Sequence, residues 1–501
     1  MLKIKQDTKY LILLVIGGLC IISSFLCFLA PVVAGILNWI WPICILYVSR
    51  YRKQKSTYIM VFITLSISFI IKYLGFFGTL TTAQLFSELA LGIEFAIVFF
   101  AAYVVDKIFY NKLPVFLSTL IFPTMYVCCA IVFMMIGYAN SSNPASLNCS
   151  LPIIAQSMSV VGETGLAFIM MWFASCVCSA IHKDSFKPSA ITAICIILVL
   201  VIFGTIRLAN QKPAEHNAHV AIGGAPIDLV FSDLDVEVEF REMDRNMKSI
   251  EAYLRRAVDQ NADIICFSEE AFNFNKNEEN IFINKVNELS SKYKLPIILP
   301  VNIDSNKNQQ LIENFIVYFD SKGNYKKNYK DHLFPIVETQ DYKDGDDGPM
   351  EASFTTKDGH EVKFAAAMCF DAQFERDLIN LSTDDSILFI PSFDWDYSNM
   401  FTVSDTAVRA YEEGITVIKP TYGGYTYAMD AYGTLTHFAE TCEASKDVVV
   451  KDIPIRRVDT EFPECVDFLY AFYFIVLIVL IGIALSKNTV KNMAASADRA
   501  K

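Results

Sequence analysis

Three residue types that together can perform acyl chemistry stand at the ends of three apolar segments of the 501-residue chain. The segment ADIICFSEE contains Glu269, NYKDHLFPIVE contains Lys330, and FAAAMCFD contains Cys369. A cysteine thiol becomes a nucleophile when a base removes its proton, and a carboxylate can be that base. A nearby ammonium stabilises both the thiolate and a developing oxyanion. Catalytic groups commonly lie on loops that follow strands, so the three segments predict one Glu–Lys–Cys site.

Each of these residues also has an ordinary structural explanation. A cysteine at the end of an apolar strand is commonly a small buried residue. A lysine in a segment such as KKNYK is commonly solvated, and an acidic pair after a strand is commonly part of a surface turn. The pair here is Glu269 and Glu270, so the identity of the base is open between two neighbours. The hypothesis therefore depends on the combination of the three residues.

The part of the chain that must position these residues alternates between strand and helix patterns. Apolar or β-branched runs that predict strands are HVAIGGAPI, ADIICFSEE, LPIILPVNI, EVKFAAAMCFD, SILFIPSFDW and ITVIKPTYG. Amphipathic helices are expected at about 243–260, 281–293 and 402–414. The segments NFIVYFDSKGNYKKNYK and TYAMDAYGTLTHFAE each predict a hairpin that turns at a glycine. This alternation predicts an α/β layered sheet and not an all-β sandwich.

Apolar stretches on both sides of this part predict membrane spans, each close to the roughly 20 residues that cross a hydrocarbon core. They lie at about 10–29, 31–49, 58–77, 86–105, 113–137, 160–181, 190–207 and 467–486. Lysine and arginine cluster in alternate loops, such as RYRKQK, whereas the loops near 78–87 and 138–159 contain neither. The positive-inside rule then places both termini in the cytoplasm and the strand–helix part outside. The prediction is a polytopic α-helical membrane bundle of about eight spans with one extracytoplasmic α/β domain.

The predicted domains differ in charge. They are a seven-span bundle at 1–208, the α/β domain at 209–466, and the eighth span with a cytoplasmic tail at 467–501. Residues 209–466 include 25 basic and 46 acidic residues, a formal net charge of −21, and the rest of the chain carries +9. A domain this acidic repels a phosphate backbone, so we expect no nucleic-acid partner.

Cysteine spacing and the acidic run DYKDGDDGPME bear on metals and disulfides. None of the 13 cysteines stands in a Cys-x-x-Cys pair, which makes a structural zinc site improbable. Cys442 and Cys465 fall in the outer part, where a disulfide is allowed. The acidic run at 341–351 suits a solvated loop better than a calcium loop, because it lacks the bidentate glutamate spacing of an EF-hand. No metal or organic cofactor is expected.

The order of the three segments ADIICFSEE, NYKDHLFPIVE and AMCFD resembles the Glu–Lys–Cys pattern of the nitrilase superfamily. Placed between seven spans and one, it is similar to the apolipoprotein N-acyltransferase family of bacterial membranes. FLCFLAPVVAGILNWIWP is similar to that family's first helical pair, and IGYANSSNPASLNCSLPIIAQSMSVVGETGLAFIMMW to its loop and sixth helix. The resemblance implies that the α/β domain is an αββα sandwich.

The resemblance implies a role for each matching residue. Glu269 matches the general base, Lys330 the oxyanion-stabilising lysine and Cys369 the nucleophile. The supporting positions that it implies are Glu338, Phe370, Asp371 and Glu412, the last within the run RAYEEG.

The chain departs from the family pattern at several positions. Ser268 stands where the family has proline, and Phe370–Asp371 stands where the acyltransferases more often have Tyr-Glu. SFDWD replaces a Ser-Asn-Asp run, and the segment between Glu338 and Cys369 is short and acidic, where the family has longer apolar lid loops.

The activity that the resemblance implies is N-acylation. An acyl chain moves from a phospholipid to Cys369 as a thioester, and then to the α-amine of a diacylated lipoprotein, in the bacterial cytoplasmic membrane. A membrane-anchored amidase with water as the acceptor is an alternative, which Phe370–Asp371 and the short acidic segment favour. A catalytically inactive lipoprotein-binding or scaffold module is a third hypothesis, against which the intact Glu, Lys and Cys argue.

Overall fold

The structure is a computed structural model, and its description covers most of the chain. The residues described are 2–23, 31–74, 82–137, 143–181, 186–223, 243–269, 271–304, 311–335, 338–339, 342–379, 381, 386–394, 399–439 and 448–499. Two compact units divide it: a helical unit of residues 1–75, 80–210 and 464–501, and a second unit made mainly of residues 211–463. Each unit is described by itself.

The helical unit contains long apolar helices linked by short turns. Its elements are α1 (Leu2–Ser23), α2 (Pro31–Tyr51), α3 (Ser56–Tyr73), α4 (Thr82–Phe109), η2 (Tyr110–Lys112), α5 (Val115–Ser118), α6 (Ile121–Met135), η3 (Ser146–Ser150), α7 (Pro152–Ala155), α8 (Met158–Ile181), α9 (Phe186–Ala209) and α15 (Phe462–Arg499). Their exposed faces carry large aliphatic side chains, such as Ile59, Val199 and Ile478, which are each more than 60% exposed. An apolar surface of this kind is stable when lipid covers it.

Seven helical segments among the described residues are long and apolar enough to cross a membrane. They are Pro31–Tyr51, Ser56–Tyr73, Glu88–Lys112, Val115–Met135, Met158–Ile181, Lys187–Ala209 and Phe462–Ser486. These seven correspond to seven of the eight predicted stretches. The remaining stretch, 10–29, coincides with α1 up to Ser23 and then enters residues 24–30, which lie outside the described part, and α1 is not among the seven.

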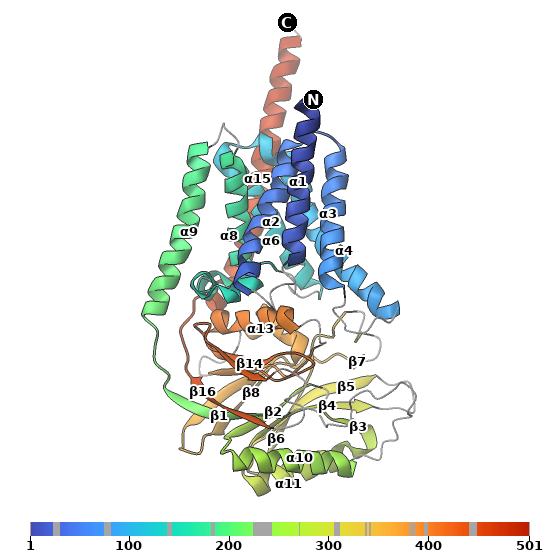
Figure 1. The fold of residues 1–501 in the computed structure, drawn as a ribbon, viewed down its shortest axis with the longest axis vertical. Helices are drawn as coiled ribbons and strands as arrows, with labels where there is room; N and C mark the ends of the chain where they lie inside the picture. The colour runs from blue at the N-terminus through green and yellow to red at the C-terminus, as the bar shows by residue number, and fades with distance from the viewer. Residues whose placement is uncertain are drawn as a thin grey trace. The chain divides into compact units, whose positions relative to one another are not determined.

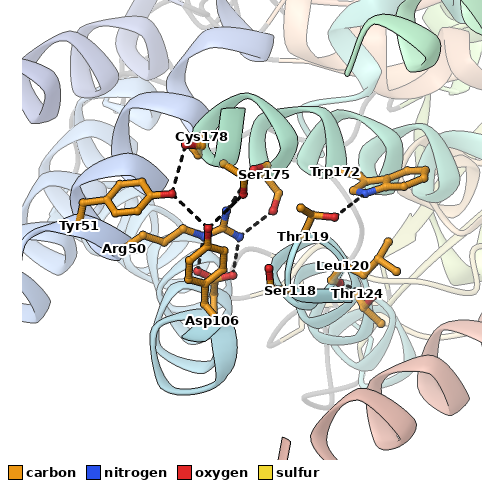
Figure 2. A network of polar contacts seen from close by, with 12 residues as sticks. Arg50, Tyr51, Asp106, Ser118, Thr119, Leu120, Thr124, Trp172, Ser175 and Cys178 are labelled. Atoms are coloured by element: carbon orange, nitrogen blue, oxygen red, sulfur yellow. Dashed lines mark hydrogen bonds and ion pairs between the residues drawn. The ribbon is translucent and has the colours of Figure 1, made fainter. Parts of the chain in front are cut away.

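A buried ion pair joins three helices of this unit (Figure 2). Arg50 of α2 donates from Nε and Nη2 to the two carboxylate oxygens of Asp106 of α4, at 2.8 and 2.7 Å. Arg50 also donates to the backbone oxygen and the hydroxyl of Ser175 of α8, and its guanidinium lies 4.1 Å from the ring centre of Tyr110. Neither charged side chain is exposed. Because an unpaired charge is costly in an apolar interior, this pair ties α2, α4 and α8 together.

The second unit is built from two sheets and the helices that cover them (Figure 1). Its strands are β1 (His216–Gly223), β2 (Ile264–Phe267), β3 (Asn273–Asn275), β4 (Ile297–Asp304), β5 (Ile312–Phe319), β6 (Tyr325–Tyr329), β7 (Tyr342–Lys343), β8 (Met350–Thr355), β9 (Glu361–Ala366), β10 (Ile387–Phe389), β11 (Ser392–Phe393), β12 (Thr416–Lys419), β13 (Thr421–Tyr422), β14 (Thr426–Met429), β15 (Leu435–Ala439) and β16 (Val449–Ile455). Its helices are α10 (Met243–Asp259), η6 (Lys276–Glu278), α11 (Glu279–Tyr293), η7 (Cys369–Gln373), α12 (Glu375–Leu378) and α13 (Asn399–Glu413).

The strands form one sheet in the order β16-β1-β2-β4-β5-β6, with β3 and β7 beside it, and a second in the order β15-β14-β12-β10-β9-β8. The short strands β11 and β13 pair separately. Within the first sheet β1, β2 and β4 are parallel, and within the second β9, β10 and β12 are parallel. Strand–helix alternation produces parallel neighbours because each crossover passes through a helix or a long connection. The predicted α/β class is confirmed.

Two apolar cores hold these layers together. One packs α10 and α11 on the first sheet and includes Leu254, Phe282 and Phe267. The other fills the space between the two sheets and includes Ile298 and Phe389. Figure 1 shows α10 and α11 on one side of the strands and α13 on the other. The order of layers is helix, sheet, sheet, helix, which explains why strands such as β2 and β12 are apolar on both faces.

The predicted hairpins form β5–β6 and β14–β15. Gly323 and Gly433 in their turns have φ angles of +99° and +85°, which glycine adopts without strain. Several sequence hypotheses fall outside the described residues: Glu270 as an alternative base, Cys442 as a disulfide partner of Cys465, and the end of the SFDWD run.

Candidate active site

The structure gathers the predicted site residues from the ends of strands in both sheets. Glu269 comes two residues after β2, and Lys330 directly follows β6; both strands belong to the first sheet. Cys369 comes three residues after β9 of the second sheet and opens the turn η7. The site therefore needs both sheets, because neither of them supplies all three residues.

Lys330 is the centre of a buried ionic cluster. Its Nζ lies 2.9 Å from Oε1 of Glu269 and 2.7 Å from Oε1 of Glu338, and the lysine side chain is fully buried. Burial by itself lowers the pKa of a lysine, but the charges of Glu269 and Glu338 raise the pKa of Lys330 well above its ordinary value. The ammonium is therefore permanently charged at neutral pH, as an oxyanion-stabilising group must be. The explanation of this lysine as a solvated surface residue is wrong.

Glu269 is held by three donors. Besides Lys330, the side-chain amide of Asn314 donates to Oε1 at 2.9 Å, and the backbone N–H of Phe393 donates to Oε2 at 3.0 Å. The carboxylate is only 2% exposed. Its orientation is set by two different sheets, since Asn314 belongs to β5 of the first sheet and Phe393 to β11 of the short β11–β13 pair.

Glu338 holds Lys330 from the other side. One of its oxygens accepts from Nζ of Lys330, and the other accepts the backbone N–H of Phe334 at 2.7 Å. The N–H of Glu338 in turn donates to the carbonyl of Phe334 at 3.0 Å. The segment KDHLFPIVE thus closes a loop on itself and places this second carboxylate against the lysine.

Cys369 occupies a strained turn at the cluster. Its φ angle is +45°, a left-handed conformation that is uncommon for a residue with a side chain. The backbone N–H donates to the carbonyl of Pro391 at 2.9 Å, and the residue is partly exposed. Burial raises the pKa of the Cys369 thiol well above its ordinary value, the charge of Glu269 raises it further, and the charge of Lys330 opposes them. The resting thiol is therefore protonated, and it needs a base at the moment of reaction.

The two residues that follow Cys369 connect it to the loop that carries Lys330. The carboxylate of Asp371 accepts the backbone N–H groups of His332 at 2.7 Å and Asp331 at 3.3 Å. Burial raises the pKa of Asp371 to about 7. Phe370 packs against Phe334 with ring centres 4.9 Å apart. Both positions connect η7 to the loop that carries Lys330 and Glu338.

Glu412 lies in a different buried cluster. It forms an ion pair with Arg409 on the same helix, α13, and the Arg409 guanidinium also lies 3.7 Å from Glu375 of α12. Since α12 directly follows η7, this cluster fastens the turn that begins with Cys369 to α13. The structure thus joins Glu269, Lys330 and Glu338 by direct contact and pairs Glu412 with Arg409.

Carboxylates connect the acidic segment at 341–351 to the neighbouring loop of Lys330 by accepting backbone N–H groups. The carboxylate of Asp331 accepts the N–H groups of Asp347 and Gly348 at 2.9 and 2.6 Å, and Asp347 accepts the N–H of Tyr329 at 3.0 Å. A cavity of about 460 Å³ lies against this segment, and its lining includes Asp331, His332 and Asp377. Within the described part of the chain, no group of three histidine, cysteine or acidic side chains is placed to hold a metal ion.

Sequence reasoning missed three residues at the site. Asn314 binds the carboxylate of Glu269, and Asp394 and Lys419 form a buried ion pair at 2.6 Å next to it. Asn314 begins the apolar run NFIVYF and Lys419 ends the run ITVIK, and a polar residue at the end of such a run is a usable signal. Asp394 carries no comparable signal, because it lies in an ordinary polar loop.

Comparison with known proteins assigns the second unit to a class. Residues 219–412 match the Carbon-nitrogen hydrolase family. This segment of the chain is a carbon-nitrogen hydrolase domain, the fold of the nitrilase superfamily. It includes Glu269, Lys330, Cys369 and Glu412, and no curated protein matches the chain as a whole or in part.

The solved structures that resemble the chain include amidases from Nesterenkonia sp. One, an amidase crystal structure, is 12% identical and covers 52% of this chain and 98% of its own, with a TM-score of 0.39. A mutant with the acetamide moiety of fluoroacetamide added at its active-site cysteine is 12% identical and covers 51% of this chain and 96% of its own, with a TM-score of 0.38.

Proposed function

We propose that this chain is an N-acyltransferase that takes an acyl chain from a phospholipid, holds it as a thioester on Cys369, and delivers it to the α-amine of a diacylated lipoprotein. The observation that carries the proposal is the buried contact of Lys330 with Glu269 and Glu338 beside a partly exposed Cys369. A chain that joins such a site to helices apolar enough to cross a membrane suits substrates that are themselves lipids.

The first half-reaction acylates the cysteine. Glu269 takes the thiol proton of Cys369, and the thiolate attacks the ester carbonyl carbon of the phospholipid. The oxygen that becomes negative is stabilised by the ammonium of Lys330. The tetrahedral intermediate then expels the lysophospholipid alkoxide, which takes the proton from Glu269, and the acyl thioester remains.

The second half-reaction transfers the acyl group. The lipoprotein α-amine attacks the thioester carbonyl while Glu269 accepts a proton from its nitrogen, and Lys330 again stabilises the oxyanion. Collapse forms the amide and expels the Cys369 thiolate, which takes the proton back from Glu269. Both half-reactions balance without a metal or an organic cofactor.

The proposal includes a location. Both substrates reside in the outer leaflet of a bacterial cytoplasmic membrane, so the domain is proposed to face outward, with both termini in the cytoplasm. The alternating basic loops support this arrangement.

The test is acyl transfer by the purified full-length protein in phospholipid vesicles with a diacylated lipopeptide. We expect an N-acylated product and, without the lipopeptide, an added acyl mass on the peptide that contains Cys369. Cys369→Ala should abolish both, whereas Cys465→Ala, a matched change at another partly exposed cysteine, should retain them. N-acylation by the Cys369→Ala protein would disprove the proposal.

Hydrolysis of a small amide by the same thioester route is the second candidate. The observation that favours it is the short acidic segment, because its charged residues Asp344, Asp346 and Asp347 offer no apolar surface for a lipid chain. Release of ammonia from a small amide, with no acyl mass from phospholipid on Cys369, would select this candidate.

A further inference from the structure

A second buried ion pair lies beside the proposed catalytic residues. Asp394 follows β11 and Lys419 ends β12, and Nζ of Lys419 lies 2.6 Å from Oδ2 of Asp394. Their side chains are only 3% and 2% exposed. The hydroxyl of Thr421 donates to the same carboxylate oxygen at 3.1 Å. Because desolvation cancels most of the attraction in a buried pair, its main contribution is to fix a geometry.

The chain segment next to Asp394 contacts both the nucleophile and its base. The carbonyl of Pro391 accepts the backbone N–H of Cys369 at 2.9 Å. Two residues later, the backbone N–H of Phe393 donates to Oε2 of Glu269 at 3.0 Å. The segment 391–393 therefore sets where Cys369 and Glu269 lie relative to each other.

This segment has little regular structure of its own. Strand β11 comprises two residues, and Ser392 and Phe393 pair with Thr421 and Tyr422 of β13. So short a pairing is marginal without further support. The ion pair of Asp394 and Lys419 lies directly after β11 and supports this pairing. The N–H of Asp394 also donates a hydrogen bond to the carbonyl of Tyr422 at 2.7 Å.

The packing around the pair leaves little freedom. A Cβ atom added at Gly424 would lie 2.5 Å from Oδ2 of Asp394. The carboxylate is thus confined between Lys419, Thr421 and the backbone at Gly424.

We infer that Asp394 and Lys419 are positioning residues, whose ion pair holds the segment 391–393 where it anchors both the amide of Cys369 and the carboxylate of Glu269. The inference rests on the proposed function in one respect: Cys369 is the nucleophile and Glu269 its base. It extends that proposal to Asp394 and Lys419, two residues that take no part in the reaction steps proposed above.

The charge of Asp394 also acts on the nucleophile, which provides a readout. The charged groups that face the Cys369 thiol are Glu269, Lys330, Asp394 and Glu338. Burial is the largest cause of the raised thiol pKa, and the charge of Asp394 adds to it. Asp394→Asn should therefore lower the thiol pKa, and Lys419→Met, which leaves the carboxylate without its cation, should raise it.

The experiment uses the full-length protein and two probes. The burst of p-nitrophenol from p-nitrophenyl butyrate measures acylation of Cys369. The pH dependence of iodoacetamide alkylation, followed on the Cys369 peptide by mass spectrometry, measures the thiol pKa. Asp430→Asn is the matched control, because Asp430 is a buried carboxylate that accepts the N–H groups of Tyr432 and Thr434 at the opposite end of β14.

We expect the burst rate to fall about tenfold or more in Asp394→Asn and Lys419→Met, because small misplacements of reacting groups are costly. Lys419→Arg keeps the cation and should keep the wild-type rate, whereas Thr421→Val should lose about threefold for one hydrogen bond. The alkylation midpoints of Asp394→Asn and Lys419→Met should move in opposite directions, and Asp430→Asn should leave both readouts unchanged. A role limited to stability would slow the variants without opposite midpoint shifts.

Burst rates of Asp394→Asn and Lys419→Met close to the wild type, or midpoints that do not move apart, would overturn the inference. If Lys419→Met does not fold, Lys419→Arg and Thr421→Val decide: losses in Thr421→Val but not in Lys419→Arg support it, and wild-type rates in Thr421→Val overturn it. A wild-type protein without a burst, or without lipid acylation, contradicts the proposed function, whereas the alkylation midpoints still test the ion pair.

Discussion

Replacement of Lys330 by methionine is expected to destabilise the second unit strongly. The ammonium lies 2.9 and 2.7 Å from two carboxylates, which at an effective dielectric constant of about 20 corresponds to about 6 kcal/mol of attraction for each pair. Desolvation of the three charges cancels much of this, but Lys330→Met keeps the desolvation and removes the attraction. Breaking a buried pair in this way typically lowers the free energy of unfolding by about 3–5 kcal/mol.

For a unit of this size, the loss corresponds to a fall in melting temperature of about 6–20 °C.

Thermal unfolding of the purified full-length protein is the assay. Lys327→Met is the matched control, because Lys327 lies on β6, the strand that Lys330 directly follows, and pairs with Glu279 at 2.5 Å while 19% exposed. That pair is near the surface, so its loss should cost about 1 kcal/mol or less. At a temperature where Lys330→Met is folded, acyl transfer should fall by about 10²–10³, the usual cost of removing an oxyanion donor.

Two results would refute this reasoning. They are equal melting temperatures for Lys330→Met and Lys327→Met, and wild-type turnover by the folded Lys330→Met protein.

Further predictions concern one residue each. Burial raises the pKa of Asp371 to about 7 from 3.8, so the folded protein binds a proton that the unfolded chain has lost, and about 4 kcal/mol of stability disappears as the pH rises from about 4 to about 7. Asp371→Asn should flatten this part of the melting-temperature profile, and an unchanged slope would contradict the assignment. Arg50→Met leaves Asp106 without its ion pair inside the helical unit and should lower the free energy of unfolding by about 3–5 kcal/mol. In thermal unfolding in detergent, the double variant with Asp106→Asn should recover part of this loss. No recovery would argue against the ion pair. Gly414 has a φ angle of +66°, and an added Cβ would lie 1.8 Å from the carbonyl oxygen of Val458, so Gly414→Ala should lose at least about 1–2 kcal/mol from the backbone conformation alone; a melting temperature equal to the wild type would contradict it.

The order and type of the elements could be predicted from the sequence because they depend on local patterns. Amphipathic helices, apolar strands and glycine turns are each encoded within a few neighbouring residues, and α10, α11 and α13 begin or end within a few residues of the predicted bounds. Apolar length likewise indicates seven helical segments among the described residues that are long and apolar enough to cross a membrane. The order of Glu269, Lys330 and Cys369 along the chain was also sufficient to mark them as candidates.

Only the tertiary structure decided how these candidates are arranged. The contacts of Lys330 with Glu269 and Glu338, and those of Glu269 with Asn314 and the N–H of Phe393, join loops that are far apart in the chain. They depend on the register of strands within two sheets and on how those sheets pack, which no local pattern encodes.

The same reason brings Asp394 to Lys419, 25 residues further along the chain. A charged residue in a sequence has no fixed neighbour until the backbone is folded, and burial then determines whether its charge is solvated or must be paired. Sequence alone therefore identified the residue types for acyl chemistry, and the packing of the two sheets determined which of them meet.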